Sequence, residues 1–175
     1  MNGFMKDELF KRLIRLDEDA DLMFDDDKRF SMVIVGGSAL ILLEVISRAT
    51  SDIDALYVSS EIIELLERYD INSAVSTFIN NFPYNYYDRL VELHKGRKID
   101  FYSASLEDIV IAKLYSGRDK DRQDITSKNV LEKLDWAILE ELAISENEAR
   151  ASALNEFRYN EFKSNYDDYV KRWRP

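Results

Sequence analysis

Several residue types are scarce or absent in this 175-residue chain. It has no cysteine, which excludes a disulfide framework and a thiolate metal site, and a single histidine, His94, which argues against a zinc centre. No apolar run is long enough to cross a bilayer, and the first residues, MNGFMKDELFKRL, lack the apolar segment of a secretory signal. We therefore expect a cytoplasmic protein with no membrane contact.

The chain also lacks an excess of basic residues. Its formal net charge is −10 at pH 7, which argues against nonspecific binding to duplex nucleic acid, because such binding needs many phosphate contacts from lysine and arginine. A local basic patch is still compatible with this total. Apolar residues make up 46% of the chain, enough for a packed core. The acidic excess is either solvated surface or, in part, a set of ligands for a divalent metal.

The hydrophobic pattern predicts a few strands among helices. Strands are expected at 31–35 and 53–58, followed by a hairpin over 90–102, and everything after residue 105 has a helical pattern. We therefore predict an α+β fold: a small mixed sheet with packed helices, followed by a helical C-terminal subdomain. The predicted division is 1–104 and 105–175, as two parts or as one compact domain. Further helices are predicted at 5–17, 38–48, 61–69 and 72–80.

The stretch VIVGGSALILLEVISRATSDIDALYV (33–58) joins a glycine turn to an acidic pair. Gly36, Gly37 and Ser38 follow the first predicted strand, and Ser38 is expected to be the N-cap of the next helix. Backbone N–H groups at a glycine turn and a helix start favour anions such as a triphosphate. Taken alone, the three residues are also consistent with an ordinary turn between a strand and a helix.

The acidic pair consists of Asp52 and Asp54 at the mouth of a predicted strand. Residues two apart project from the same face of a strand, so the two carboxylates repel each other unless a cation lies between them. Mg²⁺ binds one or two carboxylates together with substrate phosphate oxygens. A pair of exposed surface residues is the alternative. Asp100, between Ile99 and Phe101 in the hairpin, is either a third carboxylate of this site or a surface residue of an edge strand.

These residues together resemble a known superfamily. The order GGS, thirteen intervening residues, DID and then IDF resembles the nucleotidyltransferase superfamily, which has the polymerase-beta-like fold. The later segment LEDIVIAKLYSGRDKDRQDI (106–125) resembles the charged helix and turn of the AbiEii/MenT-like bacterial branch, which includes toxins of toxin–antitoxin pairs. The resemblance covers roughly residues 31–126, and no family motif is recognisable after about residue 130.

The resemblance implies a role for each matching position. The catalytic residues would be Asp52, Asp54 and Asp100, which would also hold Mg²⁺ at one or two sites, with Asp100 helping to activate the attacking hydroxyl. The nucleotide-binding residues would be Gly36, Gly37, Ser38, Arg48, Lys113, Lys120 and Asp124.

Three of these residue assignments have alternatives. Arg48 either meets phosphate or places its charge at the C-terminus of the preceding helix. Lys113 either reaches the triphosphate or extends over the core toward water. The charges of 118–122 either support the site or form a solvated, salt-linked loop.

The implied activity is Mg²⁺-dependent transfer of NMP from ATP or another NTP to an acceptor, with pyrophosphate leaving. The acceptor would be a tRNA end, a protein hydroxyl or a small molecule, and a toxin with a cognate antitoxin is one form of such an enzyme. The alternative is a catalytically silent binding module of the same fold that acts through a protein partner. For the enzyme we expect the Ser38 turn to face Asp52, and Asp100 to lie on the strand next to that of Asp54 with its side chain toward the two aspartates.

The last residues, YDDYVKRWRP, place basic side chains around Trp173. Such a basic and aromatic tail either touches nucleic acid by charge and stacking or is a helix end with cations set against the dipole. Of these two interpretations, we favour the helix end.

Overall fold

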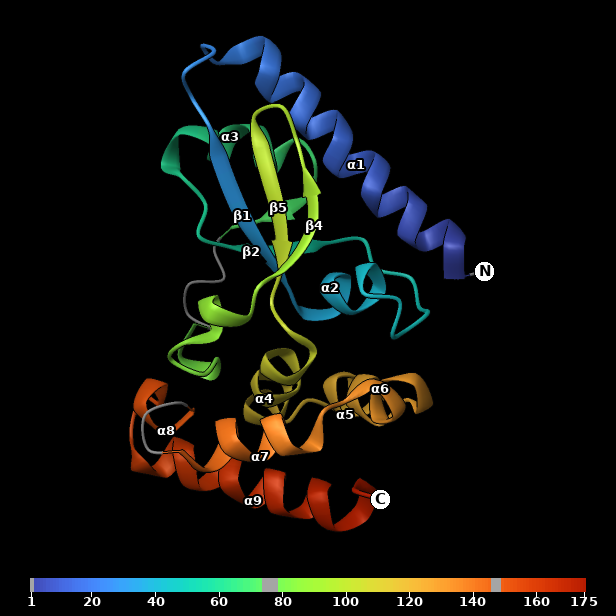
Figure 1. Ribbon diagram of the computed structural model, residues 1–175, viewed down its shortest axis with the longest axis vertical. Helices are drawn as coiled ribbons and strands as arrows, with labels where there is room; N and C mark the ends of the chain where they lie inside the picture. The colour runs from blue at the N-terminus through green and yellow to red at the C-terminus, as the bar shows by residue number, and fades with distance from the viewer. Residues whose placement is uncertain (1, 74–78, 146–148) are drawn as a thin grey trace. The chain divides into compact units, whose positions relative to one another are not determined.

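The computed structural model describes residues 2–73, 79–145 and 149–175, and Figure 1 labels its elements. The chain divides into two compact units, residues 1–76 with 90–104 and residues 77–89 with 105–175. The boundary at 104/105 coincides with the predicted division, but residues 77–89, expected in the first part, belong to the second unit.

The first unit contains the sheet. Within the described residues the strands form one mixed sheet in the order β3-β2-β1-β5-β4, with parallel pairs β1–β5 and β2–β3 and antiparallel pairs β1–β2 and β4–β5. The predicted α+β class with a small mixed sheet is confirmed. The elements of this unit are α1 (Asn2–Met23), β1 (Phe30–Val35), α2 (Gly36–Leu42), β2 (Ile53–Leu56), η1 (Ser60–Ile62), α3 (Ile63–Glu67), β3 (Ile71–Asn72), β4 (Val91–Lys95) and β5 (Ile99–Ser103).

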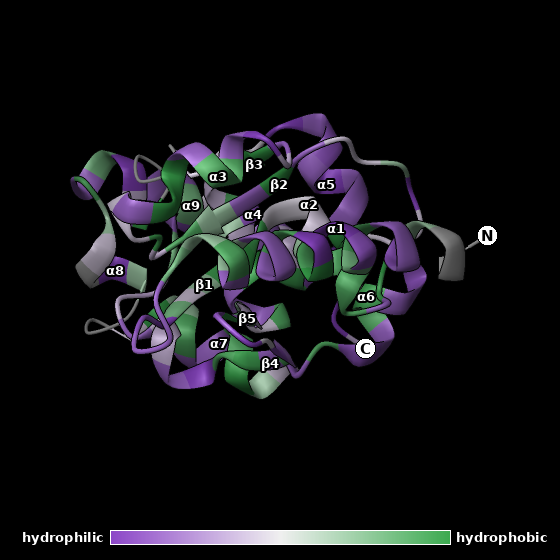
Figure 2. Cartoon of the chain, turned by 90° about the horizontal axis from the view of Figure 1, so that it is seen from above, coloured by the Kyte–Doolittle hydropathy of each residue, from purple (hydrophilic) through white to green (hydrophobic). Residues whose placement is uncertain are grey.

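The core of the first unit is built from alternate strand residues and one face of α1. Ile99 and Phe101 of β5 are fully buried, whereas the residues between and after them are partly exposed, as the period-two pattern predicts. Leu9, Leu13 and Leu16 of α1 are buried at helical spacing. Figure 2 shows hydrophobic and hydrophilic positions alternating along this helix.

Helix α2 is shorter than the sequence predicts and starts earlier. It covers Gly36–Leu42 rather than 38–48, because a Schellman motif ends it: the N–H of Val45 donates to the carbonyl of Leu40 (3.0 Å) and the N–H of Glu44 to that of Ile41 (3.0 Å). Glu44 takes the left-handed conformation that this motif requires, with φ 60°. The chain therefore leaves the helix early and has ten residues in which to return to the sheet at β2.

A buried carboxylate ties α1 to the β4–β5 turn. Asp17, which is 5% exposed, accepts hydrogen bonds from the backbone N–H groups of Arg97 (2.7 Å), Lys98 (2.8 Å) and Ile99 (2.8 Å). A Cβ on Gly96 would collide with the Asp17 carboxyl and with the carbonyl of Ile99, so the turn needs glycine there. Asp17 thus satisfies three amide donors that the hairpin leaves at its tip.

The second unit is helical, as predicted for the C-terminal region. Ser105 caps its first long helix by accepting a hydrogen bond from the N–H of Asp108 (3.1 Å). Tyr115 and Phe162 stack with ring centroids 4.2 Å apart and join the fourth helix to the ninth. Every helix in the described part of the chain is too short or too polar to cross a membrane. The elements are η3 (Tyr86–Arg89), α4 (Leu106–Ser116), α5 (Asp119–Ile125), α6 (Lys128–Lys133), α7 (Trp136–Ile144), α8 (Ala149–Ser152) and α9 (Glu156–Trp173).

Replacing Asp17 should destabilise the first unit. Asp17→Ala leaves three amide donors without their acceptor, so the free energy of unfolding should fall by about 3 kcal/mol, measured by urea denaturation. Asp21→Ala is the matched control, because Asp21 lies one turn further along α1 and contacts only the exposed side chain of Arg97, at 3.5 Å. Equal effects of the two substitutions would contradict the role of Asp17.

Candidate functional site

The pairing of β1 with β2 brings the acidic pair to the glycine turn. The two strands are antiparallel, with Val35 opposite Asp54, and Gly36 follows Val35 directly. The start of β2 therefore lies beside the start of α2. A Cβ built on Gly36 would be 3.2 Å from Oδ2 of Asp54, so the carboxylate lies against the turn. The sequence predicted that the turn faces Asp52. The carboxylate that the structure places against the turn is that of Asp54, because Asp54 is the partner of Val35 across the two strands.

The two glycines of the turn differ in what surrounds them. Gly36 has φ +68°, a conformation that L side chains rarely adopt. A Cβ on Gly37 would collide with Nη2 of Arg48, so the guanidinium group lies against the backbone of Gly37. The structure therefore places a guanidinium and a carboxylate together at the start of α2. Since α2 ends at Leu42, the alternative in which Arg48 serves the C-terminus of that helix is wrong.

Ser38 does not cap the helix. Helix α2 begins at Gly36 with Val35 as its N-cap, and Ser38 is 2% exposed, with its hydroxyl donating to the carbonyl of Val35 (3.2 Å). The prediction that Ser38 begins the helix is therefore wrong, because the helix already starts at the left-handed glycine. Ser38 still lies in the first turn, where backbone N–H groups have no acceptor within the helix and favour an anion.

The loop before β2 is held in place by hydrogen bonds to its backbone. Arg12 of α1 donates to the carbonyl of Ser51 (2.7 Å), and Thr50 donates to the carbonyl of Asp52 (3.2 Å). Asp52 is exposed immediately before β2, whereas Asp54 is half-buried within it. Asp52 thus lies at the same end of the strand as Asp54, on a loop anchored to α1.

Asp54 has one further contact that could not be predicted from the sequence. Asn72 pairs with Asp54 across the parallel strands β2 and β3, and its Nδ2 donates to Oδ1 of Asp54 (3.2 Å). The sequence predicted a helix over 72–80, but Asn72 belongs to β3, and residues 74–78 lie outside the described residues. A strand of two residues has too little pattern to be recognised. Asn72 orients the carboxylate that faces the turn.

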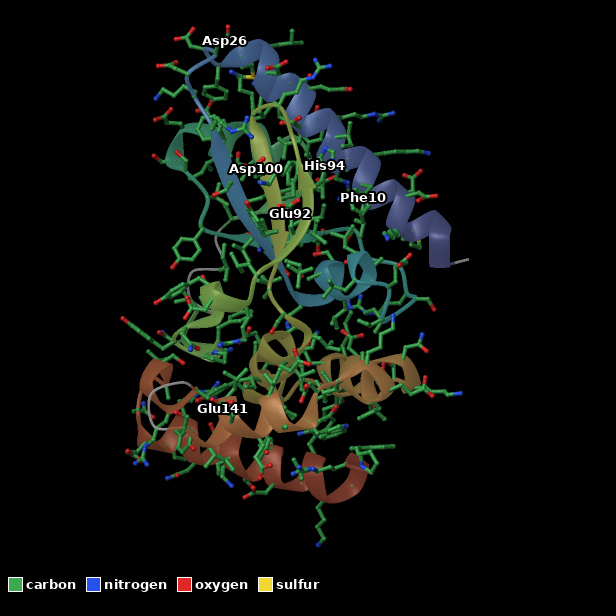
Figure 3. All side chains as sticks on the ribbon, in the orientation of Figure 1. Phe10, Asp26, Glu92, His94, Asp100 and Glu141 are labelled. Atoms are coloured by element: carbon green, nitrogen blue, oxygen red, sulfur yellow. The ribbon has the colours of Figure 1, made fainter. Side chains whose placement is uncertain are left out.

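Asp100 does not join the other two aspartates. Strand β1 lies between β2 and β5, and Asp100 pairs with Ser31, four residues from the partner of Asp54 along β1, or about 13 Å at 3.3 Å per residue. Its carboxylate is bound to Arg29 at 2.9 Å. Figure 3 labels Asp100 near Glu92 and His94 of the neighbouring strand β4. The prediction that Asp100 lies on the strand next to that of Asp54 is wrong.

The aspartates therefore supply a pair and not a triad. Across residues 2–73, 79–145 and 149–175, no three aspartate, glutamate or histidine side chains gather closely enough to hold a metal ion. Since strand order is set by long-range pairing, the apolar–Asp–apolar pattern at 99–101 could not show that its strand is separated from β2.

The predicted residues of the second unit form a buried cluster of their own. Lys113 of α4 is 6% exposed, and its ammonium group donates to Oδ1 of Asp121 (2.5 Å) and Oδ2 of Asp124 (2.9 Å). Arg118 donates to the other oxygen of Asp121 (2.7 Å), while Lys120 is exposed. Lys113 thus neither extends toward water nor lacks partners. The contact of Lys113, Lys120 and Asp124 with nucleotide stays a prediction.

The cluster shifts the titration of Asp121. Burial alone raises the pKa of this carboxyl, but hydrogen bonds from Lys113, Ser116 and Arg118, with the charge of Lys113, outweigh burial and hold the pKa below its ordinary value of 3.8. Because its pKa is lowered, the ionised carboxylate of Asp121 stabilises the folded state at pH values above 3.8. This contribution is lost as the pH falls through the lower pKa of the folded protein.

Removing the ammonium group from this cluster should destabilise the second unit. Lys113→Ala removes the cation that bridges the buried carboxylates of Asp121 and Asp124, while Arg118 still pairs with Asp121. The free energy of unfolding should therefore fall by about 3 kcal/mol. Lys120→Ala removes an exposed cation nearby and should change it by less than about 0.5 kcal/mol. Urea denaturation at neutral pH compares the two variants, and an unchanged stability of Lys113→Ala would show that the cluster is not structural.

A comparison with protein families identifies the family of the chain. The family model described as "Nucleotidyltransferase of unknown function (DUF6036)" matches residues 11–174, a range that includes the glycine turn, the acidic pair and the buried cluster of the second unit. No curated protein and no solved structure matches the chain. The superfamily resemblance is therefore confirmed, while the AbiEii/MenT-like branch stays a prediction. The chain belongs to the DUF6036 family of nucleotidyltransferases of unknown function.

Proposed function

We propose that this protein binds an NTP at the glycine turn and transfers its NMP part to an acceptor hydroxyl. The observation that carries the proposal is the convergence of the Arg48 guanidinium and the Asp54 carboxylate on Gly36 and Gly37. A cation and backbone N–H groups suit a triphosphate, and a carboxylate beside them suits the metal that accompanies it. An ordinary strand-to-helix turn needs neither side chain.

The phosphates would be bound by the turn and by Arg48. The first turn of α2 presents N–H groups, and Arg48 offers several donors in a planar fork that matches phosphate oxygens. Its Nη1 also donates to the carbonyl of Ala49 (3.3 Å), which holds the side chain near the turn. Gly37 is the position that lets the guanidinium come this close to the backbone.

The donor set fits one Mg²⁺ ion. Asp52 and Asp54 are two oxygen donors at the mouth of β2, and Mg²⁺ is commonly held by one or two carboxylates with the phosphates of the substrate. When bound, the ion would neutralise charge on the triphosphate as pyrophosphate leaves. A second ion would need further ligands, and Asp100 is committed to Arg29. Asn72 keeps the Asp54 carboxylate oriented, and we leave Asp100 out of the proposed site.

The acceptor and the biological role remain part of the proposal. A tRNA end, a protein hydroxyl and a small-molecule hydroxyl all supply the oxygen that forms the new bond to the α-phosphorus. A toxin held in check by a cognate antitoxin is the biological role that the AbiEii/MenT-like resemblance suggests. Such a role needs both the transfer activity and a partner protein.

One observation favours a second function, a nucleotide-binding module without catalysis. The described residues contain no third acidic or histidine side chain close to Asp52 and Asp54 to complete a metal site, and a third carboxylate was the expected activator of the acceptor hydroxyl. A protein of this kind would bind NTP at the same turn and act through a partner. Binding and transfer must therefore be measured separately.

Transfer should depend on the acidic pair. The protein is incubated with each labelled NTP and Mg²⁺, with bulk tRNA and cell extract as acceptors. Asp52→Asn with Asp54→Asn should abolish label transfer, because the metal loses both carboxylates, while the circular dichroism spectrum stays unchanged. Asp100→Asn is the matched control and should retain transfer. Full activity of the double variant would overturn the site, and loss of transfer in a folded Asp100→Asn variant would restore Asp100 to it.

Nucleotide binding should depend on Arg48. An NTP that binds the folded state stabilises it by about 2.7 kcal/mol at a hundredfold excess over its dissociation constant, so the melting temperature should rise with NTP and Mg²⁺. Arg48→Gln should reduce this shift, whereas Arg68→Gln, which removes an exposed cation further along the same unit, should not. A shift without transfer would support the module, and no shift with any of the four NTPs would contradict both functions.

A further inference from the structure

A second candidate site lies wholly within the second unit. A hollow of about 300 Å³ opens between the end of α4, helix α5 and the last turns of α9, a volume at the lower end of those that hold small ligands. Its side chains combine cations with aromatic rings, and they come from segments about fifty residues apart. The lining residues that matter below are Gly117, Arg122, Asp168, Tyr169, Arg172 and Trp173.

We propose that this hollow binds a nucleoside phosphate, with the base on the indole of Trp173 and the phosphate between Arg122 and Arg172. The proposal rests on residues of the second unit alone and does not depend on the transfer reaction proposed for the first. It assigns a ligand to the basic and aromatic end of the chain, for which the sequence favoured a plain helix end over nucleic-acid contact.

The phosphate end is supplied by two guanidinium groups with spare donors. Arg122 is 62% exposed and its nearest carboxylate, Asp119, is 3.9 Å away, whereas Arg172 is 67% exposed and donates from Nε to Asp168 (3.0 Å). A Cβ on Gly117 would be 4.0 Å from Nη2 of Arg122, an ordinary van der Waals distance, so this guanidinium lies beside the left-handed glycine that ends α4. Each guanidinium has five N–H donors, which exceeds what these contacts use.

The base end is supplied by Trp173. Its side chain is 44% exposed, so an indole face is available for stacking, which contributes about 1–3 kcal/mol per base. The neighbouring ring of Tyr169 is fixed: its hydroxyl donates to the carbonyl of Ile125 (2.7 Å) and its ring stacks on Trp136 with centroids 5.5 Å apart. Tyr169 is thus held in place before any ligand arrives.

The carboxylate of Asp168 limits how a phosphate can bind in the hollow. This carboxylate lines the hollow and pairs with Arg172, so it competes with a phosphate for that guanidinium. A bound phosphate must therefore rely on Arg122 and on the donors of Arg172 that Asp168 does not occupy. This predicts effects of opposite sign when the carboxylate and the guanidinium groups are removed in turn.

The test uses the full-length protein and the fluorescence of Trp173. The chain has two tryptophans, so Trp136→Phe, which keeps a ring against Tyr169, leaves Trp173 as the single reporter. The four NMPs and a single-stranded RNA pentamer should each quench its emission, while adenosine should bind at least about tenfold more weakly than AMP. If the pentamer and the NMPs bind with similar affinities, the ligand is a free nucleotide. If the pentamer binds more tightly than the NMPs, the ligand is the end of an RNA.

Variants in the same background assign the contacts. Arg122→Gln and Arg172→Gln should each weaken AMP by about tenfold or more, as expected for a charge-assisted hydrogen bond, and Asp168→Asn should tighten it. Lys171→Gln is the matched control, because it removes an exposed cation of the same turn that does not line the hollow, and it should leave the affinity unchanged.

Three results would overturn the proposal. The first is the absence of quenching by any NMP or by the pentamer at millimolar concentration. The second is an equal loss of affinity in Lys171→Gln and Arg172→Gln, because the loss would then come from the change in net charge and not from a contact with Arg172. The third is quenching that disappears in Arg48→Gln but survives in Arg172→Gln, since it would then report the turn of the first unit. None of these readouts requires NMP transfer, so failure of the proposed reaction leaves them interpretable.

Discussion

The antiparallel pairing of Val35 with Asp54 is the contact on which the candidate site depends. It sets the glycine turn, which follows Val35, against a carboxylate that the chain reaches only after leaving α2 and returning along the sheet. A shift of one residue in this register would turn Asp54 to the other face of the sheet, into the core, and bring a buried alanine or isoleucine to the turn. The Schellman end of α2 and the anchored loop before β2 both serve this register.

Local pattern was enough to predict much of the first unit. Alternation in β5 predicted that Ile99 and Phe101 are buried. This feature depends on neighbouring residues in the chain, so the sequence carries it directly. The turn was expected to face Asp52, whereas the pairing of β1 with β2 brings Asp54 to it. The start of α2 was mispredicted because a left-handed Gly36 begins the helix two residues before the serine that resembles a cap.

Features that depend on distant pairing could not be predicted in the same way. The insertion of β1 between β2 and β5 decides where Asp100 lies, and nothing in the sequence around Asp100 records it. The contact of Asn72 with Asp54 depends on a strand of two residues. Lys113 was predicted to reach the triphosphate or to extend toward water, and its burial between Asp121 and Asp124 was not foreseen, because it depends on how α4 and α5 fold back on each other.

The Asp17 contact also has a consequence for the order in which the parts of the protein fold during synthesis. Its three amide partners are residues 97–99, so about eighty residues must leave the ribosome after α1 before the hairpin can close on it. The first unit can then be completed by residue 104, while residues 79–89 must wait for the helices that follow. Nascent chains should therefore hold an ordered sheet and an unsatisfied apolar segment at the same time, a state in which chaperones have a defined stretch to protect.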